Sequence, residues 1–192
     1  MKDKTDIYLI GVGGQGIGLL SEALIRAADY ANLPVRGVDT HGLAQRGGTV
    51  ESHLRIGDGI HSALIQKGEA DMVIALERNE ALRGLSTYLK ENGDLIYYNT
   101  SWQPLDVRLE KDKDVTPERI EKASYDKDIE VIKVFKEDLE DTRMQNVVIL
   151  GQIASENLLT EIKDDHYRKA LKDLLKGEVL QKNLDLFNSL VD

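Results

Sequence analysis

Apolar residues follow two kinds of spacing over the first hundred residues, and stretches of the two kinds alternate along the chain. A short apolar run that begins at Ile7 and breaks into a glycine turn predicts a strand. The continuous apolar run at 71–76 is typical of a strand buried on both faces of a sheet. At 16–31 and 77–90 apolar residues recur every three or four positions, which predicts helices, and Gly93 is expected to end the second helix. Alternating strands and helices predict an α/β protein with a largely parallel sheet.

The segment between the first helix and the second buried strand predicts an antiparallel addition to this sheet. Residues 35–39 form a strand-like run, and residues 49–56 alternate apolar and polar positions, as a strand with one covered face does. The sequence Gly-Asp-Gly at 57–59 predicts a turn that leads into the segment 60–65. We therefore expect 49–56 and 60–65 to form a hairpin-like antiparallel pair.

The sequence beyond residue 93 predicts two more strands and a linker between them. The first strand is expected at 94–99, where the sequence reads DLIYYN. The stretch 108–128 is dense in Lys, Asp and Glu, which is typical of an exposed linker, and we expect one short helix within it at 117–123. Residues 129–135 alternate apolar and polar positions and predict an edge or late strand.

From residue 137 onward proline is absent and apolar residues recur at helical spacing, which predicts three helices that close over the sheet. We expect a single domain over 1–192, with a core at about 5–140 and C-terminal helices at about 143–190. The expected fold class is a three-layer, Rossmann-like α/β fold. It has a mostly parallel sheet, an antiparallel addition and a helical C-terminal tail.

The composition excludes several kinds of chemistry. The chain contains no cysteine, so disulfides, thiolate-ligated iron–sulfur clusters, thiolate zinc sites and a cysteine nucleophile are excluded. The formal net charge of −9 argues against a nucleic-acid partner, because neutralising phosphates requires a basic surface. No apolar run approaches the roughly 20 residues that cross a bilayer, and the charged N-terminus is unlike a signal peptide. We expect a soluble, cytoplasmic protein with no membrane partner.

The sequence GVGGQG at 11–16 is the first candidate site. It follows a strand and opens a helix, where glycines allow a tight turn and leave backbone N–H groups free for an anion or another protein. It matches the G-x-G-x-x-G template, so one interpretation is dinucleotide binding, with Asp39 on the ribose. The alternative is a turn that serves close packing or a partner protein, and the long polar side chain of Gln15 favours it. The residues expected to face a ligand or partner are Gly11, Gly13, Gly14, Gln15 and Gly16.

The sequence THGLAQRGG at 40–48 is the second candidate site. It has no periodicity and lies between two strands, at the carboxyl edge where open α/β sheets place their sites. The candidate catalytic residues are Arg46 and His41. The guanidinium of Arg46 is permanently charged and suits a carboxylate or phosphate, and His41 could carry a proton near neutral pH. The alternative is that Arg46 pairs with an internal carboxylate and that His41 is a capped loop residue. The residues expected to face a ligand or partner are Thr40, His41, Gly42, Gln45, Arg46, Gly47 and Gly48.

The sequence predicts no metal site. His53 and His61 stand across a predicted turn from each other, but no Asp or Glu completes a ligand set of recognisable spacing. The run Asp-Asp-His at 164–166 is explained more simply as the start and first turn of a helix.

Together the two motifs resemble those of a known family. IGVGGQGIGLLSEAL, followed by THGLAQRGGTVESHLRIGD, is similar to the gamma-type domain of the 2-oxoacid:ferredoxin oxidoreductases. The HG-x-AQRGG form of the second motif resembles most the small, beta subunit of indolepyruvate oxidoreductase. NVVILG at 146–151 and Asn183 fit the same pattern, whereas 108–128 and 141–143 depart from it.

The resemblance implies one subunit of an enzyme that is not catalytically complete alone. In such enzymes a large subunit carries thiamine diphosphate and iron–sulfur clusters, a 2-oxoacid is oxidatively decarboxylated to an acyl-CoA with CoA as co-substrate, and electrons pass to ferredoxin. The absence of cysteine agrees with this division, because the clusters need thiolates. We therefore expect no cofactor in this chain, a large cofactor-bearing partner, and ferredoxin as a partner through the complex. A homodimer of the isolated chain is left open.

Two alternatives to this subunit remain open from the sequence. One is a free-standing NAD(P)- or FAD-binding Rossmann protein that uses the glycine turn and Asp39. The other is an interaction module that takes no part in the chemistry.

Overall fold

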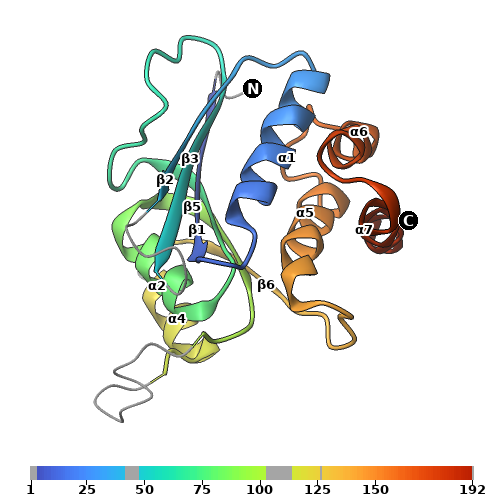
Figure 1. Cartoon of the computed structure of the whole chain (residues 1–192). Coiled ribbons are helices and arrows are strands. Elements are labelled where there is room, and N and C mark those ends of the chain that lie inside the picture. The colour runs from blue at the N-terminus through green and yellow to red at the C-terminus, as the bar shows by residue number, and fades with distance from the viewer. Residues whose placement is uncertain (1–3, 42–47, 103–113, 126, 192) are drawn as a thin grey trace.

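A computed structural model of the chain describes residues 4–41, 48–102, 114–125 and 127–191, which form a six-stranded sheet with helices on both faces (Figure 1). The strands are β1 (Lys4–Val12), β2 (Val35–His41), β3 (Thr49–Gly57), β4 (Ala70–Ala75), β5 (Leu89–Tyr98) and β6 (Glu130–Val134), in the spatial order β2-β3-β1-β4-β5-β6. β1, β4, β5 and β6 pair in parallel, while β3 pairs antiparallel with both β1 and β2. The expected mostly parallel sheet with an antiparallel addition is confirmed.

The antiparallel addition has other partners than the sequence predicts. β3 pairs with β1 and β2, and residues 60–65 lie in no strand, so the predicted hairpin is wrong. Side chains satisfy the backbone of this segment instead. The Arg55 guanidinium donates to the Ser62 carbonyl at 3.1 Å, and the Ile65 N–H donates to His53 Nδ1 at 3.2 Å. These two backbone groups are therefore paired without a partner strand.

A buried ion pair marks the register of β1 and β3. Asp6 lies opposite Arg55 in the ladder, and Arg55 Nε and Nη2 donate to its two carboxylate oxygens at 2.8 and 3.0 Å. Asp6 is only 3% exposed. Such a two-pronged contact is geometrically specific, and a slip of one residue would break it and turn the core residues of β3 to the wrong face.

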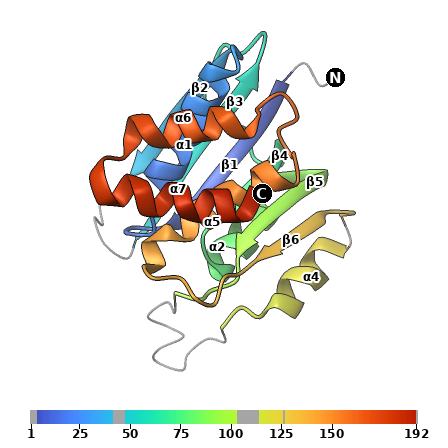
Figure 2. The same ribbon diagram turned by 90° about the vertical axis from the view of Figure 1, so that its right-hand side faces the viewer.

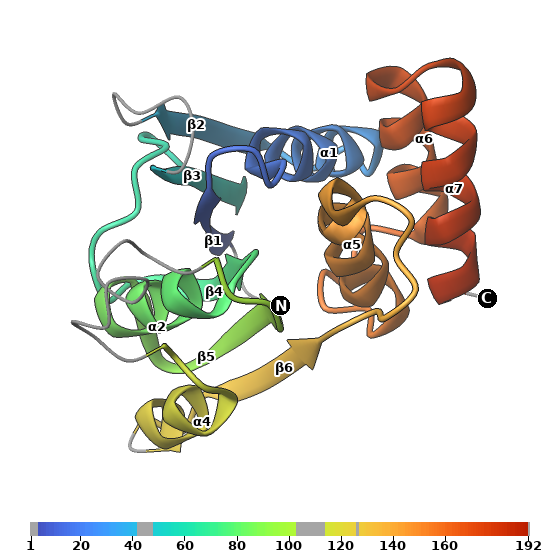
Figure 3. The same cartoon turned by 60° about the horizontal axis from the view of Figure 1, so that its bottom comes forward.

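The helices lie in layers on the two sides of the sheet. α1 (Ile17–Tyr30) and α5 (Gln145–Ser155) cover one face, and α2 (Arg78–Thr87) and α4 (Pro117–Tyr125) cover the other. α6 (Asp164–Leu174) and α7 (Gly177–Val191) pack on α1 and α5 as an outer layer (Figures 2 and 3). Of the three C-terminal helices predicted to close over the sheet, α5 packs on it directly. This helix is covered on two sides, in keeping with its unbroken apolar run at 147–150.

β1 supplies alternate residues to two hydrophobic cores. Ile7 and Leu9 belong to the core formed with α1 and α5, whereas Tyr8 and Ile10 belong to the core on the α2 side. None of the four is more than 1% exposed. The apolar run that begins at Ile7 therefore corresponds, as predicted, to a strand, and the structure shows that this strand is covered on both faces.

Gly93 lies within β5 and does not end a helix, so this prediction is wrong. α2 already ends at Thr87, and β5 begins at Leu89. A Cβ at Gly93 would lie 2.9 Å from the Asp71 carbonyl oxygen. The glycine therefore permits a close approach of β4 to β5.

Replacing Gly151 by valine should destabilise the packing of α5 on α7. A Cβ at this position would lie 2.6 Å from Leu190 Cδ1 and 2.9 Å from Leu190 Cβ, so the helices must move apart. We expect the free energy of unfolding, measured by urea titration of the full chain, to fall by about 1–3 kcal/mol. The control is Gly18→Ala on α1, where a Cβ meets nothing within 4 Å and stability should be unchanged or slightly raised. A valine variant as stable as the parent chain would contradict the close approach.

The free energy of unfolding should also fall as the pH drops below 6.5, because of His53. Burial lowers the pKa of His53 below its usual 6.5, partly opposed by the Glu51 carboxylate. The unfolded chain therefore takes up a proton in a range where the folded chain keeps His53 neutral. Its stabilising contribution is complete above pH 6.5 and is lost as the pH falls through 6.5 toward the lowered pKa.

Urea titrations at a series of pH values measure this dependence. His53→Gln should flatten the slope, which for one proton is at most about 1.4 kcal/mol per pH unit. The exposed His61 provides the matched control, since His61→Gln should leave the slope as it is. An unchanged slope in the His53 variant would rule out His53 as its source.

Candidate functional site

The glycine turn at 13–16 lies at the carboxyl edge of the sheet, beside the ends of β1 and β4 (Figure 1). From β1 the chain continues into α1 on one face of the sheet, and from β4 it continues into α2 on the other. Open α/β sheets form ligand crevices at such a point, where connections part to opposite faces. The turn therefore lies where a site is expected in this fold.

The side chain of Gln15 is buried and forms hydrogen bonds within the protein. It is 6% exposed, its Oε1 accepts from the Val12 N–H at 2.7 Å, and its Nε2 donates to the Leu76 carbonyl at 3.3 Å. A Cβ at Gly11 would lie 3.0 Å from the same Oε1. Gln15 therefore ties the turn to the end of β4, and Gly11 leaves room for its side chain.

Asn146 covers the amino terminus of α1. Gly16 is the N-cap of this helix, with φ of 86°, and Asn146 Nδ2 donates to its carbonyl at 3.2 Å. A Cβ at Gly16 would lie 2.4 Å from that Nδ2. In dinucleotide-binding proteins the pyrophosphate occupies the helix N-terminus. Here Gly16 serves close packing of α5 against the turn, whereas a Cβ at Gly14 would meet nothing within 4 Å.

The two sequence motifs meet at one hydrogen bond. The Gly13 N–H donates to the Gly48 carbonyl at 2.9 Å, directly beyond the Val12–Thr49 pair that ends the β1–β3 ladder. Thr40 is exposed near the end of β2, and its hydroxyl donates to the Glu51 carbonyl at 3.3 Å. Of the other candidates, Gly42, Gln45, Arg46, Gly47 and the side chain of His41 lie outside the described residues.

Asp39 is far from the position that ribose binding would require. β3 lies between β1 and β2, so Asp39 is two strands from the glycine turn, about 10 Å across the sheet. Its Oδ1 accepts from the Ser52 hydroxyl at 2.6 Å and from the Ser21 hydroxyl at 3.3 Å. The geometry therefore does not support the dinucleotide interpretation, in which the second strand adjoins the first.

Two clefts open beside the glycine turn and share Gly14 and Arg143. The larger, about 630 Å³, lies between the turn, η1 (Thr142–Met144) and α7, and is lined in part by Asn146 and Asn183. Both residues are part of the sequence pattern that resembles the family, and in the fold they lie beside the first motif. Arg143 forms a two-pronged ion pair with Asp141, which lowers the pKa of that carboxyl.

The smaller cleft, about 290 Å³, lies at the ends of β5 and β6. Its wall carries two large exposed apolar side chains, Trp102 at 55% and Phe135 at 59% exposure. Exposed aromatic residues around a crevice are typical of surfaces that bind other proteins.

Sequence reasoning missed two buried carboxylates beside the site. Glu77 is fully buried and caps α2, where it accepts from the Asn79 and Trp102 N–H groups at 3.0 and 3.3 Å. Glu80 is 5% exposed, and burial raises the pKa of its carboxyl. For Glu77 the signal in the sequence was an acid directly after the buried run at 71–76, which is the position of a helix cap.

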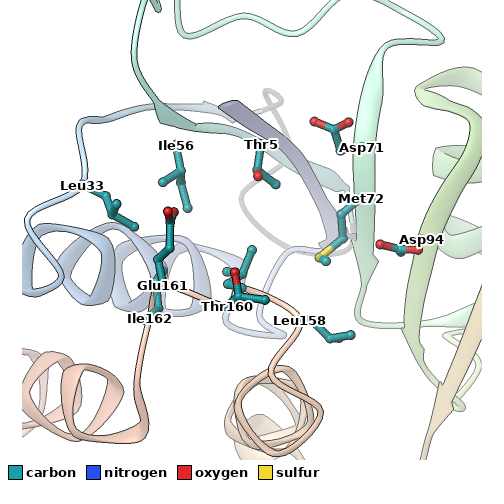
Figure 4. A pocket seen from close by; sticks show the side chains of 11 residues that line it. Thr5, Leu33, Ile56, Asp71, Met72, Asp94, Leu158, Thr160, Glu161 and Ile162 are labelled. Carbon is teal, nitrogen blue, oxygen red and sulfur yellow. The ribbon is translucent and has the colours of Figure 1, made fainter. Parts of the chain in front are cut away.

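A third cavity, about 250 Å³, lies at the opposite, amino edge of the sheet (Figure 4). Its lining includes Thr5, Asp71, Asp94 and Glu161 and no residue of either motif. The Asp71 carboxylate is engaged by the Asp6 N–H at 2.8 Å and by Lys90. The cavity is therefore separate from the candidate site.

Comparison with known proteins identifies the family. A family model described as pyruvate ferredoxin/flavodoxin oxidoreductase matches residues 6–191. The chain belongs to this family. The indolepyruvate oxidoreductase subunit IorB of Archaeoglobus fulgidus is 32% identical over 94% of this chain and 90% of that protein. The same subunit of Methanothermobacter thermautotrophicus is 42% identical over 52% of this chain and 49% of that protein.

Solved structures of the family share the fold. The keto/oxoacid ferredoxin oxidoreductase gamma subunit of Geobacter sulfurreducens aligns with a TM-score of 0.68 and 21% identity, over 97% of this chain and 96% of that one. The 2-oxoglutarate:ferredoxin oxidoreductase of Magnetococcus marinus aligns over all of this chain and 31% of its own, with a TM-score of 0.69 and 18% identity. The chain is thus a subunit of a 2-oxoacid:ferredoxin oxidoreductase, similar to IorB.

Two kinds of feature are absent from the residues that the structure describes. No helix there is long and apolar enough to span a membrane. The same residues contain no group of three or more His, Asp or Glu side chains placed to hold a metal ion. His53 and His61 do not form a pair, because His53 is buried with Nδ1 bonded to the Ile65 N–H and His61 is exposed.

Replacing Gly16 by alanine should cost more stability than replacing Gly14. Both have positive φ, 86° and 106°, so each alanine carries backbone strain of about 1–2 kcal/mol. Gly16→Ala adds a clash with Asn146, whereas Gly14→Ala enters open space. Urea titration measures both, and adding Asn146→Ala to the Gly16 variant should recover the steric part. Equal losses in the two single variants would show that Asn146 does not restrict Gly16.

Proposed function

We propose that this chain is the small, non-cofactor subunit of an indolepyruvate-type 2-oxoacid:ferredoxin oxidoreductase. Its large partner subunit carries thiamine diphosphate and iron–sulfur clusters, and the complex converts a 2-oxoacid and CoA to an acyl-CoA with electrons passing to ferredoxin. The similarity to IorB over nearly the whole chain supports the indolepyruvate type. The lack of any cysteine supports the division of labour, because this chain has no thiolate for a cluster.

The observation that carries the proposal is the hydrogen bond from the Gly13 N–H to the Gly48 carbonyl. It joins the two motifs at the carboxyl edge of the sheet, beside clefts with exposed aromatic walls. We propose that this edge faces the partner subunit. A buried aromatic and arginine-rich centre is typical of such interfaces.

Arg46 is the residue that we propose to act on a ligand from this edge. A guanidinium binds carboxylates and phosphates in a two-pronged manner, and both a 2-oxoacid and CoA carry such groups. The Magnetococcus marinus enzyme, which shares the fold, was solved with 2-oxoglutarate, coenzyme A and succinyl-CoA bound. The target of Arg46 is therefore an anion of the substrate, of CoA or of the partner, and His41 is a second candidate for contact with it.

The test is a tagged pull-down of the chain with its partner subunit under anaerobic conditions, followed by kinetics of the eluted complex. The eluate should contain iron and thiamine diphosphate, and it should reduce viologen when an arylpyruvate is added. Arg46→Ala should lower kcat/KM for the oxoacid or for CoA by roughly tenfold or more, because it removes a charge-assisted contact. The control is Arg119→Ala on the exposed surface of α4, which should leave the kinetics unchanged.

Three other outcomes would each overturn part of the proposal. Full turnover with unchanged constants in the Arg46 variant would remove Arg46 from the site. Weaker assembly with normal turnover of the complex that does assemble would indicate an interaction module. Elution of the chain alone with a bound dinucleotide would support the Rossmann alternative.

A further inference from the structure

We propose that Glu80 and Arg83 of α2 are positioning residues, which act through Thr49 to hold the end of the second motif against the glycine turn. The proposal rests on the proposed function, because it concerns the placement of the motif that contains Arg46. It assigns a role to α2, which contains no residue of either motif.

The three side chains form a closed set of contacts. The Thr49 hydroxyl donates to Glu80 Oε1 at 3.1 Å and accepts from Arg83 Nη1 at 3.0 Å. A hydroxyl has the donor and the acceptor that this arrangement needs. Arg83 Nε completes the set with an ion pair to Glu80 Oε2 at 3.4 Å. The orientation of the Thr49 side chain is thus specified from two directions.

Thr49 is also the residue at which the second motif joins the sheet. It pairs with Val12 at the end of the β1–β3 ladder, and the preceding Gly48 carbonyl accepts from the Gly13 N–H at 2.9 Å. The start of β3 is therefore held by the glycine turn on one side and by α2 on the other. Arg46 precedes Gly48 by two residues and Thr49 by three in the sequence.

The stability of α2 explains this buried carboxylate only in part. Glu80 lies in the first turn of α2, where a negative charge is favourable, but its hydrogen bond to β3 goes beyond that role. Glu77 already caps the helix, and the remaining buried face consists of Ala81, Gly84 and Leu85. The side chain of Glu80 is only 7% exposed, whereas that of Arg83 is 57% exposed. Burying a carboxylate has a cost, which is reflected in the raised pKa of Glu80. This carboxylate reaches out of its own helix to one hydroxyl on β3, which points to a specific placement of that strand.

The consequence concerns turnover more than assembly. If the contact is lost, Gly48 and Thr49 keep their ladder partners but are no longer fixed from α2, and fewer complexes hold the motif in its productive position. Catalytic groups need placement to within a fraction of an ångström, so a small displacement is sufficient to slow the reaction.

The experiment uses the assembled complex with variants of this chain. Thr49→Val keeps the shape of the side chain and removes the hydroxyl, and we expect kcat/KM to fall about three- to tenfold. Thr49→Ser restores the hydroxyl and should return kcat/KM to within about twofold of the parent. Glu80→Gln should lower kcat/KM less than Thr49→Val does, because it loses the ion pair with Arg83 but keeps an oxygen that accepts from the Thr49 hydroxyl. The control is Thr5→Val at the amino end of β1, which should leave the kinetics unchanged.

Coupling to Arg46 separates positioning from a general loss of stability. In an Arg46→Ala background, Thr49→Val should have little further effect, because the group that it positions is gone. Equal effects with and without Arg46, or failure of Thr49→Ser to restore activity, would overturn the proposal. If Arg46→Ala impairs turnover while Thr49→Val does not, the positioning role of Glu80 and Arg83 is wrong and the proposed function stands. If Arg46→Ala has no effect, both assignments fail.

Discussion

The antiparallel ladder between β1 and β3 is the constraint on which the candidate site depends. It pairs Lys4 with Gly57 at one end and Val12 with Thr49 at the other. The buried pair of Asp6 and Arg55 specifies its register, since a side-chain period of two leaves no tolerance for a slip of one residue. Because of that register, Gly48, the last residue of the second motif, lies next to the glycine turn. Contacts at the amino edge of the sheet thus support the geometry at its carboxyl edge.

The same ladder changes what the glycine-rich turn does. Because β3 separates β2 from β1, the acidic side chain at the end of β2 lies away from the turn and binds Ser52. The N-terminus of α1 is covered by Asn146, and Gly16 provides the space for that side chain. The motif serves packing at Gly11 and Gly16 and leaves Gly14 facing the clefts. Such a turn suits a subunit that contributes a shaped surface to a complex and has no cysteine with which to ligate a cluster.

Patterns in the sequence predicted the elements that are covered on both faces and failed where side chains take over the role of a strand. The runs at 7–12 and 71–76 became central strands, because continuous apolar sequence requires burial on both sides. The segment 60–65 was also predicted to be a strand, yet Arg55 and His53 bond backbone groups of residues 62, 64 and 65. Apolar spacing reports how far a segment is buried. It does not report which groups its backbone bonds to.

By itself the sequence determined the order of strands and helices apart from the segment 60–65, the glycine turn, the absence of thiolate chemistry and the two motifs of the family, all of which follow from local sterics and composition. Only the tertiary structure decided which distant residues meet. Asn146 lies 130 positions from Gly16, and Glu80 lies 31 positions from Thr49. Their contacts depend on the spatial order of the strands and on which face each helix covers, and hydrophobic periodicity along a chain encodes neither. For that reason the two motifs could be found from the sequence, while the α2 residues beside them could not.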